Sequence, residues 1–140
     1  MGKICYGRLV LGGLVAGLVL NIGELVLNMW FLAKDWEDAM KALNKQPMGG
    51  SASIAFVVLC FVLGILITWV YAAIRPRFGP GPKTAVCAGL AVWMLAYAWP
   101  SLSAMVMGVF PAKLFVIGMI WGFFELLIAA LAGCWFYKEE

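Results

Sequence analysis

Two glutamates, Glu24 and Glu125, lie inside long segments that otherwise carry no charge, and they are the residues best placed to do chemistry. A carboxylate at membrane depth costs at least ~2.5 kcal/mol, so such a residue normally faces a bundle interior or a water path and marks a functional site. There it can carry protons, bind a cation or hydrogen-bond a polar ligand. Alternatively, it bonds across a helix interface as structural glue or pairs with a partner subunit.

Small and polar residues accompany each glutamate at spacings of three or four, which places each set along one stripe of a helix. Such stripes allow close backbone approach between membrane helices. We therefore expect the first and last segments to pack together, with Asn21 and Asn28 beside Glu24 in an ion- or solute-binding site. The predicted helix-packing positions are Gly13 and Gly17 in the first segment and Gly118 and Gly122 in the last.

The two glutamates are expected at similar depth. At a rise of about 1.5 Å per residue, Glu24 and Glu125 differ in depth by roughly 5 Å in an antiparallel pair, so they can share one site. Two nearby carboxylates in poorly solvated surroundings cannot both stay ionised at low cost. We therefore expect one of them to hold a proton near neutral pH.

Three aromatic residues, Trp93, Tyr97 and Trp121, lie deep within the apolar segments and are candidates for lining a cavity. Their ring faces suit a hydrophobic, quinone-like or cationic guest. Ordinary aromatic packing is the alternative. Pro100 cannot donate to the helix ladder, so we expect a kink that widens the bundle near the level of Glu24.

The composition is that of a membrane protein. Hydrophobic residues make up 65% of the 140-residue chain and charged residues 12%, whereas soluble domains are roughly half apolar and about a quarter charged. Continuous apolar runs of about 20 residues without dyad alternation predict spanning helices. The expected fold class is all-α, an integral membrane four-helix transmembrane bundle forming one domain over 1–140, with spans at about 9–32, 53–74, 84–107 and 114–137.

The connections between spans carry their own signals. After the first span, Asp35 is placed to cap a short helix in which Trp36, Ala39 and Leu43 share one face. We expect this amphipathic helix to lie at the membrane interface, as a linker or as a lid or partner surface. The segment 75–83 is rich in proline and glycine and predicts a tight turn between the second and third spans.

Basic residues favour a multi-pass protein of the cell inner membrane with both termini inside, although the bias is modest. In that orientation the cytoplasmic side carries Lys3, Arg8, Arg75, Arg77, Lys83 and Lys138, and the opposite side carries Lys34, Lys41, Lys45 and Lys113.

Several chemistries lack their usual residues. The chain contains no histidine, so the usual haem ligand, the common zinc sites and the commonest general base are missing. We predict no catalytic residues and no metal site, and no cofactor can be named. No P-loop, dinucleotide fingerprint or nucleophile elbow occurs. No basic cluster or aromatic platform suggests nucleic acid.

The architecture resembles that of the small multidrug resistance transporters, on the basis of four spans in a short chain and a glutamate in the first span. The resemblance implies exchange of protons for lipophilic cations by a dimer. This chain is longer, carries a second glutamate at Glu125, and has an amphipathic first loop. No motif matches residue by residue.

Two functions remain open from the sequence. The first is a small polytopic membrane protein that moves protons, cations or small solutes through an intramembrane carboxylate site. The second is a non-catalytic accessory or structural subunit of a larger membrane complex. A four-helix chain has little interior of its own, so we expect association within the lipid bilayer, either as a homo-oligomer or with other subunits.

Overall fold

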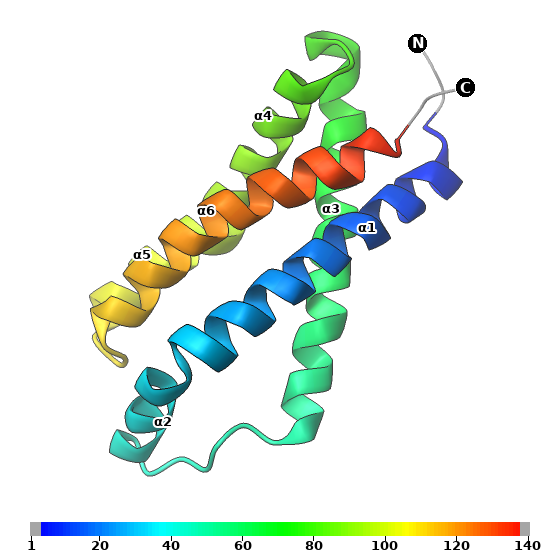
Figure 1. Ribbon diagram of the computed structural model, residues 1–140. Coiled ribbons are helices and arrows are strands. Elements are labelled where there is room, and N and C mark those ends of the chain that lie inside the picture. Colours follow the sequence, from blue (N-terminus) through cyan, green and yellow to red (C-terminus); the bar gives the residue numbers. More distant parts are fainter. Residues whose placement is uncertain (1–3, 138–140) are drawn as a thin grey trace.

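The computed structural model describes residues 4–137 and is built from helices (Figure 1). Among them are four rods that are long and apolar enough to cross a membrane. The first rod joins α1 to a π-helical segment, η1, and the third joins α4, a second π-helical segment, η2, and α5. The elements are α1 (Tyr6–Val26), η1 (Leu27–Phe31), α2 (Ala33–Ala42), α3 (Gly50–Phe78), α4 (Pro82–Trp93), η2 (Met94–Ala98), α5 (Trp99–Met107) and α6 (Ala112–Trp135).

The rods confirm the predicted all-helical class and the four apolar segments. They run over Tyr6–Phe31, Gly50–Phe78, Pro82–Met107 and Ala112–Trp135. Large apolar side chains on all of them, such as Leu18, Phe56, Leu95 and Ile120, are exposed. Such surfaces suit lipid rather than water, and the crossing of a membrane itself remains a prediction.

α3 ends differently from the prediction, because it continues through Pro76. Proline removes one backbone donor from the helix, and α3 ends two residues later, at Phe78. The helix is closed by Gly79 N, which donates to Arg75 O at 2.8 Å. The turn is therefore shorter than expected, with Gly79 and Gly81 at φ values of 80° and 132°. α4 then begins at Pro82, a position where the missing proline N–H has no helical partner to lose.

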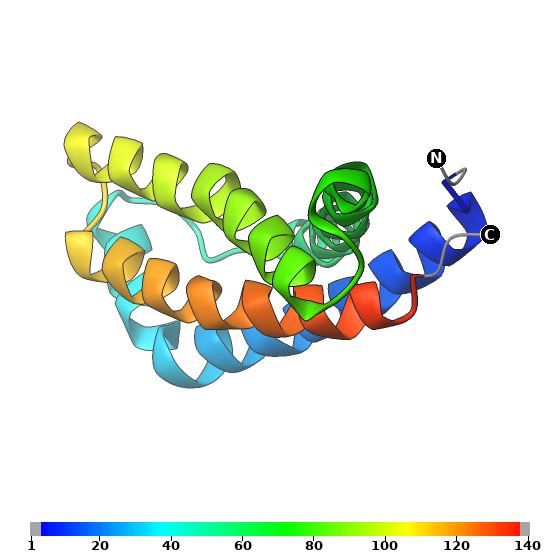
Figure 2. The ribbon, with the colours of Figure 1, turned by 90° about the horizontal axis from the view of Figure 1, so that it is seen from above.

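α1 and α6 each pack against more than one of the other long helices. α1 packs against α3 on one face and α6 on another, while α4 packs against α6 and α3. α3 crosses α1 near the middle of α1. The first half of α3 diverges from α5 and α6 (Figure 1). The first turn of α1 and the last turn of α6 lie at the same end of the bundle (Figures 1 and 2).

Glycines make the crossing of α1 and α3 close. A Cβ at Gly64 would lie 2.3 Å from Gly13 O and 2.3 Å from Gly17 N, and a Cβ at Gly13 would lie 2.6 Å from Ile65 Cα. Gly13 and Gly17 are therefore packing residues, as predicted, but they face α3. The prediction that they face the last helix is wrong, because a stripe shows which residues share a face and not which helix covers it.

The contact between α1 and α6 uses the neighbouring face of α1. A Cβ at Gly12 would lie 2.5 Å from Gly133 O, and a Cβ at Gly133 would lie 2.8 Å from Ala16 Cβ. Consecutive residues of a helix point about 100° apart. Gly12 therefore faces α6, whereas Gly13 faces α3. The two helices predicted to pack together do so. On α1 the contact uses Gly12 and Ala16, one residue before Gly13 and Gly17, and on α6 it uses Gly133.

The two remaining packing candidates in α6 behave differently from each other. A Cβ at Gly122 would lie 2.5 Å from Cδ1 of Tyr97, so this glycine accommodates an aromatic ring of η2. A Cβ at Gly118 would meet nothing within 4 Å. Within residues 4–137 no other helix of this chain therefore packs on Gly118, and its packing role stays a prediction.

α2 is the predicted short amphipathic helix. It begins before Asp35, with Leu32 at the N-cap, so Asp35 lies in the first turn rather than at the cap. Ala39 joins Leu27, Leu32 and Leu114 in a buried cluster that fastens α2 to η1 and α6. Its place at a membrane surface remains a prediction.

Candidate functional site

Glu24 is held by a hydrogen-bond donor on each carboxyl oxygen. Tyr97 Oη donates to Oε1 at 2.5 Å, and Asn28 Nδ2 donates to Oε2 at 2.8 Å. Tyr97 belongs to η2, so the bond ties the first long helix to the third. An ionised carboxylate is an acceptor only, and two donors aimed at its two oxygens suit that form.

Asn28 extends this network to α2. Its Oδ1 accepts a hydrogen bond from Trp36 Nε1 at 3.0 Å, and its Nδ2 also lies 2.9 Å from Glu24 O. Amide and indole N–H groups are donors that stay protonated at ordinary pH. Asn28 and Trp36 therefore orient Glu24 and do not relay protons. The sequence predicted Trp36 only on the apolar face of an amphipathic helix, and its bond to the site was not foreseen.

Both donors to Glu24 lie on π-helical segments. Asn28 belongs to η1 and Tyr97 to η2. A π turn inserts one extra residue and redirects the side chains near it, and such turns recur at functional sites. At the end of η2, Trp99 N donates to Met94 O, five residues back. A π segment therefore lies directly before Pro100, and the predicted kink stays a prediction.

Asn21 is not a neighbour of the Glu24 carboxyl network. Its Nδ2 donates to Gly17 O at 2.9 Å within α1 and to Val57 O of α3 at 3.3 Å. It therefore supports the crossing of α1 and α3. The predicted binding role of Asn21 does not fit this position, since the residue lies on the face that α3 covers.

Glu125 is the second carboxyl of the site, and it is only 6% exposed. Its carboxyl lies against Gly23 of α1, where a Cβ would be 2.2 Å from Oε1 and 2.7 Å from Cδ. The backbone N–H of Glu24 approaches the Glu125 carboxyl without reaching hydrogen-bond geometry. Within residues 4–137, neither Glu125 oxygen has a hydrogen-bond partner. The structure thus brings the two glutamates together, but with very different partners.

Gly23 is a site residue that the sequence analysis missed. It lies off the small-residue stripe of α1, and the signal that could have found it is its place directly before Glu24. Because a side chain there would occupy the space of the Glu125 carboxyl, Gly23 permits the two acids to approach each other.

The aromatic candidates have three different environments. Trp93 Nε1 donates to Met119 O at 3.0 Å, and its ring packs edge-on against Phe123 with centroids 5.3 Å apart. Trp93 therefore joins α4 to α6 and does not fit the predicted cavity role. Tyr97 is the donor to Glu24 described above, and Trp121 lines a groove.

This groove lies between α1 and α6 and has a volume of about 500 Å³. Ile22, Ile120 and Phe124 are 57%, 59% and 60% exposed, so the groove opens on the outer surface of the helix pair. Its walls are apolar, and Glu125 lies among the lining residues. The full lining is Val19, Ile22, Gly23, Ile117, Ile120, Trp121, Phe124, Glu125 and Ile128.

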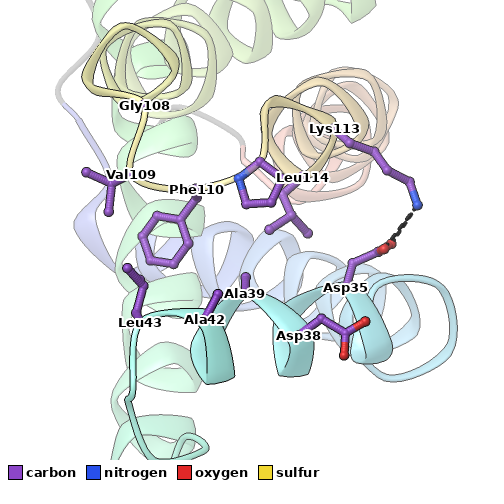
Figure 3. Close-up of a pocket in the computed structure, with 11 residues that line it drawn as sticks. Asp35, Asp38, Ala39, Ala42, Leu43, Gly108, Val109, Phe110, Lys113 and Leu114 are labelled. Carbon is purple, nitrogen blue, oxygen red and sulfur yellow. Dashed lines mark hydrogen bonds and ion pairs between the residues drawn. The ribbon is translucent and has the colours of Figure 1, made fainter.

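A second cleft, of about 450 Å³, lies between α2 and the turn that joins α5 to α6 (Figure 3). Phe110 and Leu114 face Ala39 and its neighbours across it, and Lys113 Nζ pairs with Asp35 at 3.0 Å. The cleft contains no part of the Glu24 network. Its charged rim and apolar floor match the amphipathic character expected of α2.

The exposed face of α2 carries one further ion pair. Lys41 Nζ donates to Glu37 Oε1 at 2.6 Å, one helical turn away. This hydrogen bond, together with the attraction of the charges, lowers the pKa of Glu37 and raises the pKa of Lys41. Such exposed pairs contribute little to stability.

Comparisons of the chain with protein-family models, with curated proteins and with solved structures give no match.

Proposed function

We propose that this chain is a small polytopic protein of the cell inner membrane, with both termini inside, which moves protons, alone or with a cation or small solute, through Glu24 and Glu125. The observation that carries the proposal is the unequal pair of acids. Glu24 accepts hydrogen bonds on both oxygens, whereas the buried Glu125 accepts none within residues 4–137. A buried carboxyl without donors is stable mainly when it is protonated or bound to a ligand.

Two groups of the site can both take up and release a proton, namely the two carboxyls, and the Tyr97 hydroxyl donates a hydrogen bond to one of them. Tyr97 is bonded to Glu24 and its ring lies against Gly122, one turn from Glu125 on α6. Asn28 holds the acceptor in place while the proton state of the pair changes.

The test is proton movement by the purified protein in proteoliposomes. An imposed pH gradient and a dye trapped inside the vesicles report flux, with and without a membrane potential. We expect wild-type protein to carry protons and Glu24→Gln or Glu125→Gln to abolish the flux, because glutamine keeps the shape and cannot exchange a proton. Glu37→Gln, on the exposed face of α2, is the control and should retain it. Equal flux in wild type and both site variants would overturn the proposal.

One observation favours the alternative of an accessory subunit. The first half of α3 is exposed on nearly every side, including Ile54, Phe56, Val57, Val58 and Leu59. A helix covered only by lipid leaves room for a neighbour, because membrane helices gain stability by packing. Purification in mild detergent separates the two functions. A homo-oligomer supports transport, whereas stoichiometric unrelated subunits support the accessory role.

A further inference from the structure

The groove between α1 and α6 contains two buried polar atoms of opposite character. The carboxyl of Glu125 is an acceptor, and the indole Nε1 of Trp121 is a donor. In the described part of the chain, neither has a hydrogen-bond partner. Both residues line the groove, and they lie one helical turn apart on the same face of α6.

Unpaired groups of this kind are costly. Burying a polar group without a hydrogen bond costs roughly 1 to 3 kcal/mol by protein mutational data, and a charged group costs more. Elsewhere in residues 4–137, deep polar side chains such as Asn28, Trp93 and Thr68 have hydrogen-bond partners. The two unpaired groups are thus concentrated at one place, and that place is the groove.

We propose that this groove binds a membrane-soluble alcohol, a molecule with an apolar chain and a hydroxyl head group. A hydroxyl both donates and accepts, so it can bond to the Glu125 carboxyl and to Trp121 Nε1 together. An ammonium group only donates, and it would leave the indole N–H unpaired. An ether only accepts, and it would leave an ionised Glu125 unpaired.

The rest of the groove fits the apolar chain. Its volume of about 500 Å³ lies within the range of about 300 to 1,000 Å³ that is usual for small-molecule sites. Its rim is formed by exposed residues such as Ile22 and Phe124 on the outer surface of the bundle. A ligand therefore reaches the groove sideways from the hydrocarbon. Because both polar atoms are covered in this conformation, its head group bonds to them once the side chains of Trp121 and Glu125 turn toward the groove.

The hydroxyl also tolerates either proton state of the acid. It donates to an ionised Glu125 and accepts from a protonated one. This inference rests on the proposed function insofar as both use Glu125. Binding is measured without any proton gradient, however, so a failure of binding and a failure of proton movement are separate results.

The experiment is photolabelling of the full chain in lipid nanodiscs with a diazirine-bearing hexadecanol. Labelled peptides are mapped by mass spectrometry, and unlabelled competitors are added in excess. We expect labels on the groove residues of α1 and α6. Hexadecan-1-ol should compete, whereas its methyl ether and hexadecylammonium should compete at least several-fold less well.

Two variants test the polar floor. Trp121→Phe keeps the ring and removes the donor, and Glu125→Leu keeps the bulk and removes the acceptor. Each should weaken competition by hexadecan-1-ol roughly 2- to 12-fold, the range expected for one neutral hydrogen bond. Trp69→Phe, at an exposed position of α3 outside the groove, is the matched control and should have no effect. Size-exclusion profiles identify any variant that fails to fold, and the competitor series in wild-type protein still decides the question.

Three results would overturn the proposal. Equal competition by the methyl ether would mean that no hydrogen bond donated by the ligand selects it. Stronger competition by hexadecylammonium would assign the groove to a cation. Labels spread evenly over all four long helices would mean that the alcohol only partitions into the surrounding lipid.

Discussion

Replacing Gly23 by alanine tests the contact on which the carboxylate site depends. The added Cβ would lie 2.2 Å from Oε1 of Glu125, 2.7 Å from Cδ and 3.0 Å from Cγ. Real Cβ atoms essentially never come closer than 3.0 Å to such a neighbour. The end of the Glu125 side chain must therefore move away from α1, toward the groove that it lines.

Two opposing contributions set the size of the effect. Alanine in place of glycine in an open helix interior stabilises by about 1 kcal/mol. Overpacking of a closed site costs about 1 to 3 kcal/mol, and the lower half of that range applies because a carboxyl at the end of a flexible chain can swing aside. We therefore expect Gly23→Ala to destabilise the protein by up to about 1 kcal/mol.

The assay is unfolding in mixed micelles, with Gly118→Ala as the matched control. Gly118 also lies within a long helix, but a Cβ there meets nothing within 4 Å, so this variant should gain up to about 1 kcal/mol. In a Glu125→Ala background, Gly23→Ala should become as favourable as Gly118→Ala. Equal effects of the two alanines in the wild-type background would refute the contact between Gly23 and Glu125.

Three further predictions follow from the same structure. Gly64→Ala should destabilise the fold more than Gly23→Ala, because its Cβ would meet backbone atoms at 2.3 Å that cannot swing aside; an unfolding free energy equal to wild type would contradict this. Tyr97→Phe removes one donor to Glu24 and should cost about 0.6 to 1.7 kcal/mol in the same assay, whereas Tyr6→Phe at an exposed position should be silent. Reporters placed after Glu140 and within α2 should map to opposite sides of the membrane, and finding both on one side would exclude four spans.

The helices were predictable because their signal is local. A continuous apolar run of spanning length has few other solutions in lipid, and four such runs became four rods. The approach of Glu24 and Glu125 was also anticipated, since a count of residues along two antiparallel helices fixes relative depth. Burial of Glu125 against Gly23 agrees with that estimate.

The partners of each face were not predictable from spacing. Gly13, Gly17 and Asn21 share a stripe with Glu24, yet the stripe is divided between neighbours, because α3 crosses α1 and covers only the first part. Beyond that crossing, Glu24 meets Tyr97 instead. A helical stripe has the same spacing whichever helix covers it, so only the crossing angle decides its partner.

The π segments could not be predicted from the helical periodicity of the sequence either. Periodicity of 3.6 residues assumes an unbroken α-helix, and η1 and η2 each interrupt it where a donor to Glu24 lies. Pro100 gave a signal for η2, since it removes a backbone donor. No such signal marks η1, because the segment Leu27–Phe31 contains no proline or glycine.

The network around Glu24 makes the position of α2 part of the site. Trp36 bonds to Asn28, and Asn28 bonds to one oxygen of Glu24. The exposed ion pair of Asp35 and Lys113 contributes little to stability. The hydrogen bond from the Trp36 indole and the apolar cluster around Ala39 therefore hold α2 in place. A displacement of α2 would free the amide of Asn28 to turn and would weaken one of the two bonds to Glu24. Whatever binds or moves α2 therefore acts on the one acid of the pair whose carboxyl is held by two donors.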